Sequence, residues 1–284
     1  MYNILMFVKR LLVITGPTAT GKTKLGVELA EEFSGEIISA DSRQVYKYLD
    51  IGTGKDLKHW QWGVDLVLPN EPFSVADWVK YTIKVVRDVW KREKLPIIVG
   101  GTGQYIKELL HPSETLNIPP NEELRSKLSS YQVIKLQEEL QKLDKNKWES
   151  MNDSDKKNPR RLIRAIEIQK SKFKNQNYNL KLKNFDYLAI GLTAPLEYLY
   201  KKIDERVEER IKLGMEEERE KLKKMGYFPD AFGYKETSVG EWKNHERQYA
   251  KRQLAYLKKY LPEIEWFDVS HDYSSEICQI LSRW

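Results

Sequence analysis

The chain has 284 residues, with 48 lysines and arginines against 42 aspartates and glutamates, so its formal net charge is +6. Charged residues make up 32% and hydrophobic residues 40% of the sequence, a balance that excludes a disordered chain and a membrane-embedded one. Cys278 is the single cysteine, which excludes an internal disulfide and a cysteine-ligated zinc site and is typical of a cytoplasmic protein.

The N-terminal residues do not have the order of a signal peptide. Lys9 and Arg10 follow the short apolar run instead of preceding it, and no small-residue cleavage site comes after them. No stretch approaches the roughly 20 apolar residues that a membrane-spanning helix needs. We therefore expect no membrane association.

The first 110 residues alternate between strand and helix patterns. Continuous apolar runs that stop at glycine or aspartate predict buried parallel strands, and apolar residues at helical spacing separate them. Ser74 is placed to cap the longer helix. In order, the pattern predicts strand 10–15, helix 22–33, strand 36–41, helix 74–94 and strand 96–101. This order predicts a doubly wound parallel sheet of the α/β class.

The middle of the chain is helical and rich in charge. Its clearest helix begins near Asn158, a suitable N-cap, with Pro159 in the first turn. The Lys/Asn-rich residues 170–184 have few apolar anchors and predict a loop. The remaining pattern predicts strand 185–193, helices 194–214 and 242–261, strand 263–270 and helix 274–284.

Residues 16–23, GPTATGKT, match the P-loop pattern G-x-x-x-x-G-K-(S/T) in full, between a predicted strand and a predicted helix. Backbone N–H groups and the helix N-terminus would attract phosphate, Lys22 adds a full charge, and Thr23 can bind a phosphate-borne Mg²⁺. The loop does not distinguish a nucleoside triphosphate from an organic diphosphate. The expected phosphate-binding residues are Gly16, Pro17, Thr18, Ala19, Thr20, Gly21, Lys22 and Thr23.

The P-loop makes the predicted fold a P-loop NTPase-like doubly wound sheet with an inserted helical lobe. We expect the first part of the core at 1–118, the lobe at 119–184 and completion of the core at 185–284.

Asp41 ends the second predicted strand. The carboxyl ends of parallel strands line the ligand crevice of an open α/β sheet, so Asp41 should lie near the P-loop. A carboxylate there can bind a metal ion or accept a proton from a nucleophile. It can equally cap a helix formed by residues 42–49, and the sequence leaves both interpretations open.

A series of motifs resembles one enzyme family over nearly the whole chain. Together they resemble bacterial tRNA dimethylallyltransferases, which isopentenylate a tRNA adenosine. The motifs, in order, are GPTATGKT, ISADSRQVYKYLDIGTGK, FSVADW, PIIVGGTGQYIKELL, NPRRLIRAIEI, RVEERIKLGM, AFGYKE and YAKRQLAYLKKY. Residues 56–72 and Gln104 depart from the family pattern, which affects individual contacts rather than the reaction.

The resemblance implies a reaction and its residues. Dimethylallyl diphosphate would bind at the P-loop, the exocyclic amine of the adenosine 3′ of the anticodon would attack its allylic carbon, and diphosphate would leave. Asp41 resembles the general base, Thr18 the donor to the diphosphate, and Arg210 the cation at the leaving group, with Mg²⁺ as cofactor. The expected tRNA contacts are Asp41, Ser42, Arg43, Gln44, Thr102, Arg125, Arg160, Arg161, Arg164, Lys251, Arg252 and Gln253. We expect a monomer.

Two groups of basic residues also have ordinary interpretations. Lys202, Arg206 and Arg210 recur on one helix face, where like charges are unfavourable unless an anion or neighbouring glutamates relieve them. Arg161 and Arg164 can be surface residues, with Glu167 as a partner.

Three other functions remain open from the residues alone. An adenylate isopentenyltransferase acting on free AMP, ADP or ATP would share the P-loop and the acid. A P-loop kinase or ATPase would require a nucleoside triphosphate. An RNA-binding module without catalysis would not need Asp41.

Overall fold

The structure is a computed structural model that describes residues 8–171 and 180–284. Most of the predicted loop at 170–184 and the start of the N-terminal apolar run lie outside the described residues. The chain forms two compact units, Met1–His111 with Lys181–Trp284, and Pro112–Leu180. The second unit overlaps the predicted lobe at 119–184.

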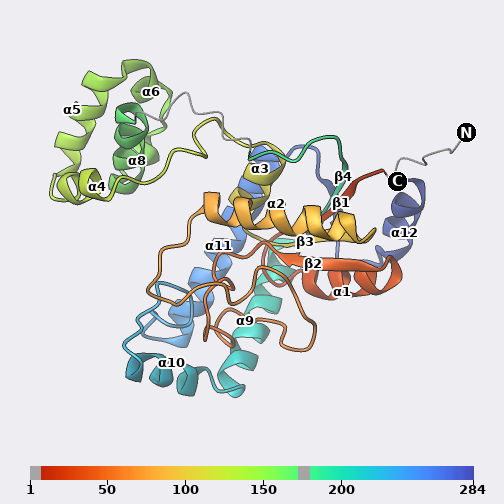
Figure 1. The fold of residues 1–284 in the computed structure, drawn as a ribbon. Helices are drawn as coiled ribbons and strands as arrows, with labels where there is room; N and C mark the ends of the chain where they lie inside the picture. Colours follow the sequence, from red (N-terminus) through yellow and green to blue (C-terminus); the bar gives the residue numbers. More distant parts are fainter. Residues whose placement is uncertain (1–7, 172–179) are drawn as a thin grey trace, which may run out of the picture. The chain divides into compact units, whose positions relative to one another are not determined.

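A five-stranded parallel sheet forms the centre of the first unit (Figure 1). Its order is β2-β3-β1-β4-β5, so β1 and the loop that follows it lie between β3 and β4. All five predicted strands and the doubly wound α/β fold class are confirmed. The strands are β1 Arg10–Thr15, β2 Gly35–Ser39, β3 Leu95–Gly100, β4 Asp186–Thr193 and β5 Glu265–Asp268.

Helices cover both faces of this sheet. On one face, α1 (Lys22–Glu32) and α12 (Ser274–Arg283) pack on apolar side chains of the strands. Figure 1 shows α2 (Val75–Lys91) on the opposite side from α1, near α3 (Gly103–Leu110). Ser74 caps α2 as predicted, in a capping box with Asp77.

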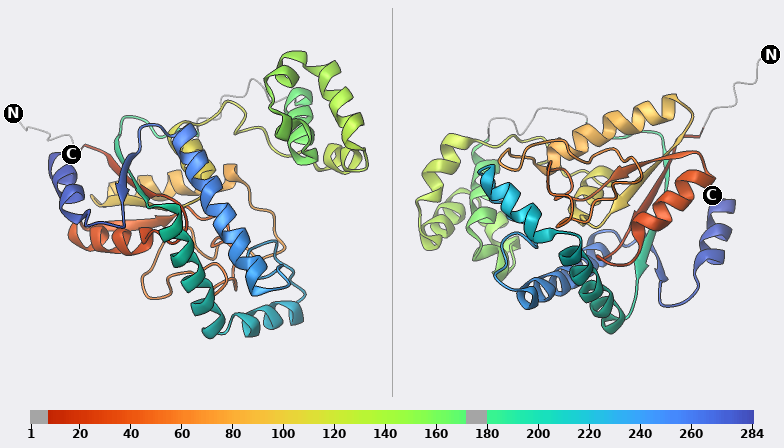
Figure 2. Two further views of the ribbon diagram at one scale, coloured as in Figure 1. Left: turned by 180° about the vertical axis from the view of Figure 1, so that it is seen from behind. Right: turned by 90° about the horizontal axis from the view of Figure 1, so that it is seen from below.

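Two long helices, α9 (Leu196–Lys212) and α11 (Val239–Tyr260), pack side by side (Figure 2). Between them in sequence lies α10 (Met215–Lys224), which starts after Gly214 in a left-handed conformation at φ 100°. Side chains from α9 and α11 line a cavity together with residues at the carboxyl ends of β1, β2 and β3. This arrangement brings residues from distant parts of the chain to the end of the P-loop.

The second unit is a small helical bundle with its own apolar core, built around Leu128, Leu136, Leu140, Leu162 and Ile166. Its helices are α4 Glu122–Ser129, α5 Val133–Leu143, α6 Lys145–Ser150, α7 Asp153–Lys156 and α8 Pro159–Lys170. The predicted start of α8 is confirmed, because the Asn158 side chain accepts a hydrogen bond from the Arg161 N–H and Pro159 occupies the first turn.

Within residues 8–171 and 180–284, no helix combines the length and the apolar character needed to cross a membrane.

Candidate active site

The P-loop backbone has a conformation that favours glycine at two positions. Gly16 has φ 140°, and a Cβ there would lie 2.1 Å from the Leu192 carbonyl oxygen. Gly21 has φ 82° and immediately precedes α1. These glycines direct the loop around the N-terminus of α1, where unpaired N–H groups attract anions. The predicted location and shape of the phosphate loop agree with this geometry.

Lys22 points back over this loop, and its Nζ donates to the Pro17 carbonyl oxygen at 2.6 Å. Burial, and after it the positive charge of Arg206, lowers the pKa of Lys22 to about 7, whereas Asp41 acts in the opposite direction. Burial and Arg206 therefore destabilise the ammonium, and an anion bound beside it would favour its charged form.

Arg206 contacts Thr18 of the P-loop. Its Nη1 donates to Thr18 Oγ1 at 2.7 Å. Burial, and after it the charge of Arg210, lowers the pKa of Arg206 to about 10. Arg210, which the resemblance placed at the leaving group, also lines the cavity and forms a buried ion pair of 2.8 Å with Glu246 on α11. The spacing of these arginines was visible in the sequence, but it did not indicate which one reaches Thr18.

Asp41 lines the same cavity and also caps the chain that follows it. Its Oδ1 accepts from the N–H groups of Arg43 at 2.8 Å and Gln44 at 3.4 Å. The helix expected at residues 42–49 is wrong, because these residues form turns. The structure gives Oδ2 no hydrogen-bond partner among the residues it describes. One oxygen can therefore hold the turn while the other remains available for chemistry.

Gln44 and Thr102 hold the backbone around Asp41. Ser39 Oγ donates to Gln44 Oε1 at 3.0 Å, and Gln44 Nε2 donates to the carbonyl oxygens of Thr53 and Gly54. The Ser42 N–H donates to Thr102 Oγ1 at 3.0 Å. Both expected tRNA contacts thus also have a structural role.

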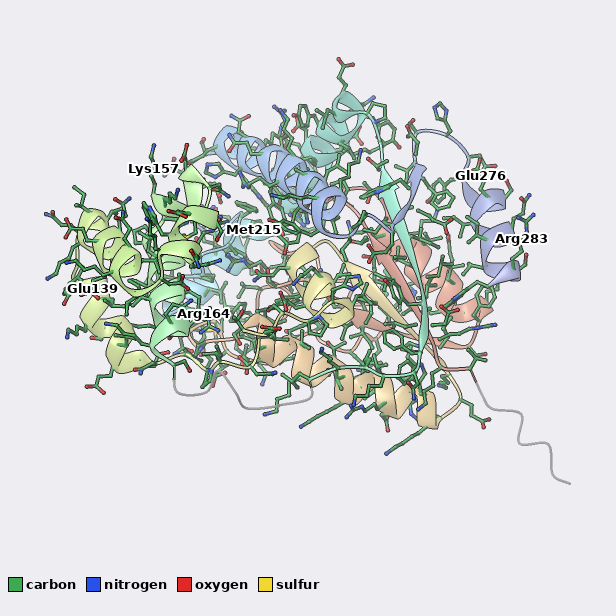
Figure 3. All side chains as sticks on the ribbon, turned by 90° about the horizontal axis from the view of Figure 1, so that it is seen from above. Glu139, Lys157, Arg164, Met215, Glu276 and Arg283 are labelled. Atoms are coloured by element: carbon green, nitrogen blue, oxygen red, sulfur yellow. The ribbon has the colours of Figure 1, made fainter. Side chains whose placement is uncertain are left out.

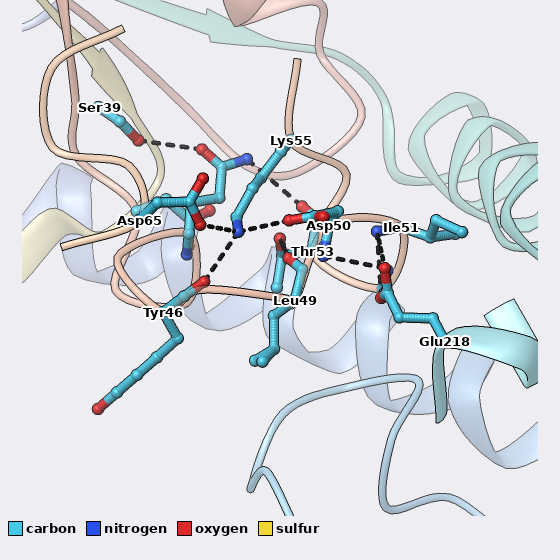
Figure 4. Close-up of polar contacts among 12 residues, drawn as sticks. Ser39, Tyr46, Leu49, Asp50, Ile51, Thr53, Lys55, Asp65 and Glu218 are labelled. Atoms are coloured by element: carbon cyan, nitrogen blue, oxygen red, sulfur yellow. Dashed lines mark hydrogen bonds and ion pairs between the residues drawn. The ribbon is translucent and has the colours of Figure 1, made fainter. Parts of the chain in front are cut away.

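The loop at residues 50–55 is fixed by charged side chains that sequence reasoning missed (Figure 4). The Glu218 carboxylate accepts from the N–H groups of Asp50, Ile51 and Gly52 at 2.9–3.1 Å. The buried Lys55 ammonium pairs with Asp50 and Asp65. Asp65 belongs to the segment that departs from the family pattern, and here it neutralises Lys55.

Gln253, another expected tRNA contact, is buried and joins two loops. Its Oε1 accepts from the Thr18 N–H at 2.9 Å, and its Nε2 donates to the Gly101 carbonyl oxygen at 2.9 Å. Its neighbours Lys251 and Arg252 are exposed on α11, and Lys251 lies over the Tyr200 ring.

The second unit holds the four arginines expected to contact tRNA. Arg125 and Arg164 both pair with the buried carboxylate of Glu167, and Arg164 also donates to the Ile118 carbonyl oxygen at 2.8 Å. Arg164 is labelled in Figure 3. Arg161 pairs with Asp155, and Arg160 is exposed. The ordinary interpretation is confirmed in the pairing of Arg164 with Glu167, but Arg161 pairs with Asp155 rather than Glu167.

The cavity at the end of the P-loop measures about 210 Å³. It brings together cations that can neutralise an anion and a carboxylate that can accept a proton, and so it is suited to transfer of a group from a phosphorylated donor. The charged and hydroxyl residues that line it include Thr18, Lys22, Thr23, Asp41, Arg206 and Arg210.

Comparison with known proteins gives consistent matches. A model of the family described as IPP transferase matches residues 44–260, and one described as isopentenyl transferase matches residues 9–63. The tRNA dimethylallyltransferase of Thermoanaerobacter sp. (strain X514) is 38% identical, with 94% of this chain and 93% of that protein covered. The tRNA dimethylallyltransferase of Clostridioides difficile (strain 630) is 37% identical, with 91% of each covered.

Solved structures show the same similarity. The tRNA isopentenylpyrophosphate transferase of Bacillus halodurans aligns with a TM-score of 0.68 and 33% identity, covering 96% of this chain and 94% of that one. A eukaryotic dimethylallyltransferase acting on tRNA aligns with a TM-score of 0.76 and 25% identity, covering 92% of this chain and 74% of that one.

Proposed function

The chain belongs to the IPP transferase family, and from this we infer that it is a tRNA dimethylallyltransferase, an enzyme that prenylates tRNA. The observation that carries the assignment to this cavity is that Thr18, Lys22 and Arg206 lie around one space with Asp41 at its wall. We propose dimethylallyl diphosphate as the donor, the N6 amine of the adenosine 3′ of the anticodon as the acceptor, and a monomeric cytoplasmic enzyme.

The proposed reaction assigns each group one task. The amine nitrogen forms a bond to the allylic carbon while the carbon–oxygen bond to diphosphate breaks, and the diphosphate keeps that electron pair. Thr18, Lys22 and Arg206 stabilise the growing negative charge, a kind of contribution worth about 10²–10³-fold in rate per donor. Asp41 accepts the amine proton, which contributes roughly 10²–10⁴-fold.

A tRNA base reaches such a cavity only if it leaves its stack. Enzymes that act on a base extrude it into a pocket and recognise it there. The exposed cations Arg43, Lys251 and Arg252 are suited to contact the RNA backbone at the rim of the first unit.

We propose that Mg²⁺ enters together with the diphosphate. In the part of the chain that the structure describes, no group of three or more His, Cys, Asp or Glu residues could hold an ion by itself. The Thr23 hydroxyl lines the cavity and is an oxygen ligand of the kind Mg²⁺ prefers. When bound, the ion would offset the charge of the diphosphate.

A transfer assay tests this function and separates it from the alternatives. Labelled dimethylallyl diphosphate is offered with tRNA, with AMP, and without acceptor. We expect label in tRNA only. Label in AMP would support an adenylate isopentenyltransferase, and transfer of phosphate from a nucleoside triphosphate would support a kinase. Either of those results without labelled tRNA would contradict the proposal.

A further inference from the structure

Arg210 and Glu246 form an ion pair that is almost fully buried. Arg210 is 5% exposed and Glu246 is 6% exposed, and Arg210 Nη1 lies 2.8 Å from Glu246 Oε1. The Trp242 indole donates to the same oxygen at 3.3 Å. Among the residues that the structure describes, Arg210 Nε is buried without a hydrogen-bond partner. Buried ion pairs contribute little net stability because both charges lose their hydration, so stability alone does not account for this pair.

The pair belongs to the wall of the phosphate cavity. A Cβ on Gly54 would lie 2.5 Å from Arg206 Nη2 and 2.6 Å from Arg210 Nη2, so both guanidinium groups reach the same short stretch of backbone. Arg206 in turn contacts Thr18, where the diphosphate is proposed to bind. Arg210 is therefore a second guanidinium near the one that contacts the P-loop.

The cavity has more cations than carboxylates. Lys22, Arg206 and Arg210 are its inner cations, with Arg43 at the exposed rim, and the carboxylates lining it are Asp41 and Glu246. Asp41 is close enough to favour the charged forms of Lys22 and Arg206. Glu246 is therefore the carboxylate that neutralises Arg210 directly.

We propose that Glu246 is a positioning residue that neutralises Arg210 and thereby limits how tightly the cavity holds the diphosphate product. This inference rests on the proposed function for the identity of the product. Bond cleavage adds negative charge to the leaving group, so a cavity with too much positive charge would bind the product more tightly than the donor. Product release limits turnover in many enzymes. By pairing with Arg210, Glu246 would lower the barrier to release of the diphosphate.

Binding of inorganic pyrophosphate in the presence of Mg²⁺, measured by calorimetry without tRNA, tests the inference. Glu246→Gln keeps the shape of the side chain and removes its charge, so we expect pyrophosphate to bind about tenfold more tightly. The double variant Arg210→Met, Glu246→Gln removes one charge of each sign and should return the affinity to within about threefold of the wild type.

A matched control lies on the same two helices. Glu208 on α9 pairs with Lys243 on α11, and neither residue lines the cavity. Glu208→Gln should leave pyrophosphate affinity unchanged. Thermal unfolding of each variant checks that it folds, and the double variant keeps the test valid if the unpaired arginine of Glu246→Gln prevents folding.

Kinetics supply a readout that a purely structural role would not change. In Glu246→Gln we expect the multiple-turnover rate on tRNA to fall more than the single-turnover rate, because release slows while bond cleavage does not. Unchanged or weaker pyrophosphate binding in Glu246→Gln, or tight binding that persists in the double variant, would overturn the inference. If the wild-type protein did not prenylate tRNA, the proposed function would be contradicted. That outcome is distinguishable because pyrophosphate binding is measured separately.

Discussion

Arg206 Nη1 and Thr18 Oγ1 are joined by a hydrogen bond of 2.7 Å, although 188 residues separate them in sequence. The contact connects α9 to the P-loop and places a permanent positive charge beside the expected position of the breaking bond. It also orients the Thr18 hydroxyl, because the guanidinium can only donate and the hydroxyl oxygen must accept. The remaining hydroxyl hydrogen can therefore point to a phosphate oxygen.

Replacing Arg206 should affect the chemical step. We expect Arg206→Met to lower the single-turnover rate by about 10²–10³-fold with little change in tRNA affinity, because the charge it meets develops only as the bond breaks. Thr18→Ala should act in the same direction. The control is the double variant Arg210→Met, Glu246→Gln, which removes the neighbouring ion pair as a whole. A larger rate loss in that control would indicate that Arg210, as the resemblance implies, stabilises the leaving group.

Asp41→Asn should bind both substrates and lose most of the rate. The amide oxygen can still accept from the Arg43 and Gln44 N–H groups, so the turn should persist, but the proton acceptor is gone. We expect a loss of about 10²–10⁴-fold in the single-turnover rate at saturating substrates. A rate near that of the wild type would leave Asp41 with the capping role only.

Gln253 should prove important for stability rather than for direct binding of RNA. Gln253→Leu leaves the Thr18 N–H without its partner and removes one of the two hydrogen bonds that the Gly101 carbonyl accepts, which should cost about 1–3 kcal/mol in the free energy of unfolding. Urea denaturation measures this loss. The exposed neighbour provides the control, because Arg252→Ala should leave stability unchanged and weaken tRNA binding. Equal stability of both variants, with weaker tRNA binding in Gln253→Leu, would restore the role of Gln253 as an RNA contact.

Among the arginines of α8, we expect Arg160 and Arg161 to contribute to tRNA binding and Arg164 to contribute mainly to stability. Arg160 is exposed and Arg161 has a surface partner, so Arg160→Ala with Arg161→Ala should weaken tRNA binding and flatten its log–log salt dependence by roughly 0.7–0.9 per lost phosphate contact. Arg164→Ala removes a partner of the buried Glu167 and should mainly reduce stability. Affinities measured at several salt concentrations check both expectations. An unchanged slope in the double variant would make these arginines ordinary surface residues.

Above neutral pH, Lys22 should take up a proton when pyrophosphate binds. Burial and the charge of Arg206 lower the pKa of Lys22 to about 7, so Lys22 is increasingly neutral as the pH rises above 7. An anion favours the charged form and raises this pKa, so affinity should fall between pH 7 and pH 9 by up to about tenfold per pH unit.

Calorimetry at pH 8 in two buffers with different ionisation enthalpies measures the protons taken up. In Lys22→Arg the guanidinium stays charged, so this uptake should disappear while the ionisation of pyrophosphate itself remains the same. The same proton uptake in both proteins would show that Lys22 binds pyrophosphate already protonated.

The sequence determined the elements and the place of the phosphate loop. Patterns of apolar residues predicted the five strands, and residues 16–23 predicted a loop that has glycine at two positive-φ positions, Gly16 and Gly21. Ser74 and Asn158 marked helix starts correctly. These features depend on residues close together in the chain, so a local pattern contains the information needed to predict them.

The tertiary structure alone decided which side chains meet in the cavity. No local pattern favoured Arg206 over Arg210 at Thr18, a buried Gln253 between two loops, or the pairing of Glu246 with Arg210. These contacts depend on how α9 and α11 pack against each other and above the carboxyl ends of the strands. Side chains one helical turn apart have the same local pattern, and only the packing of elements distant in sequence distinguishes them.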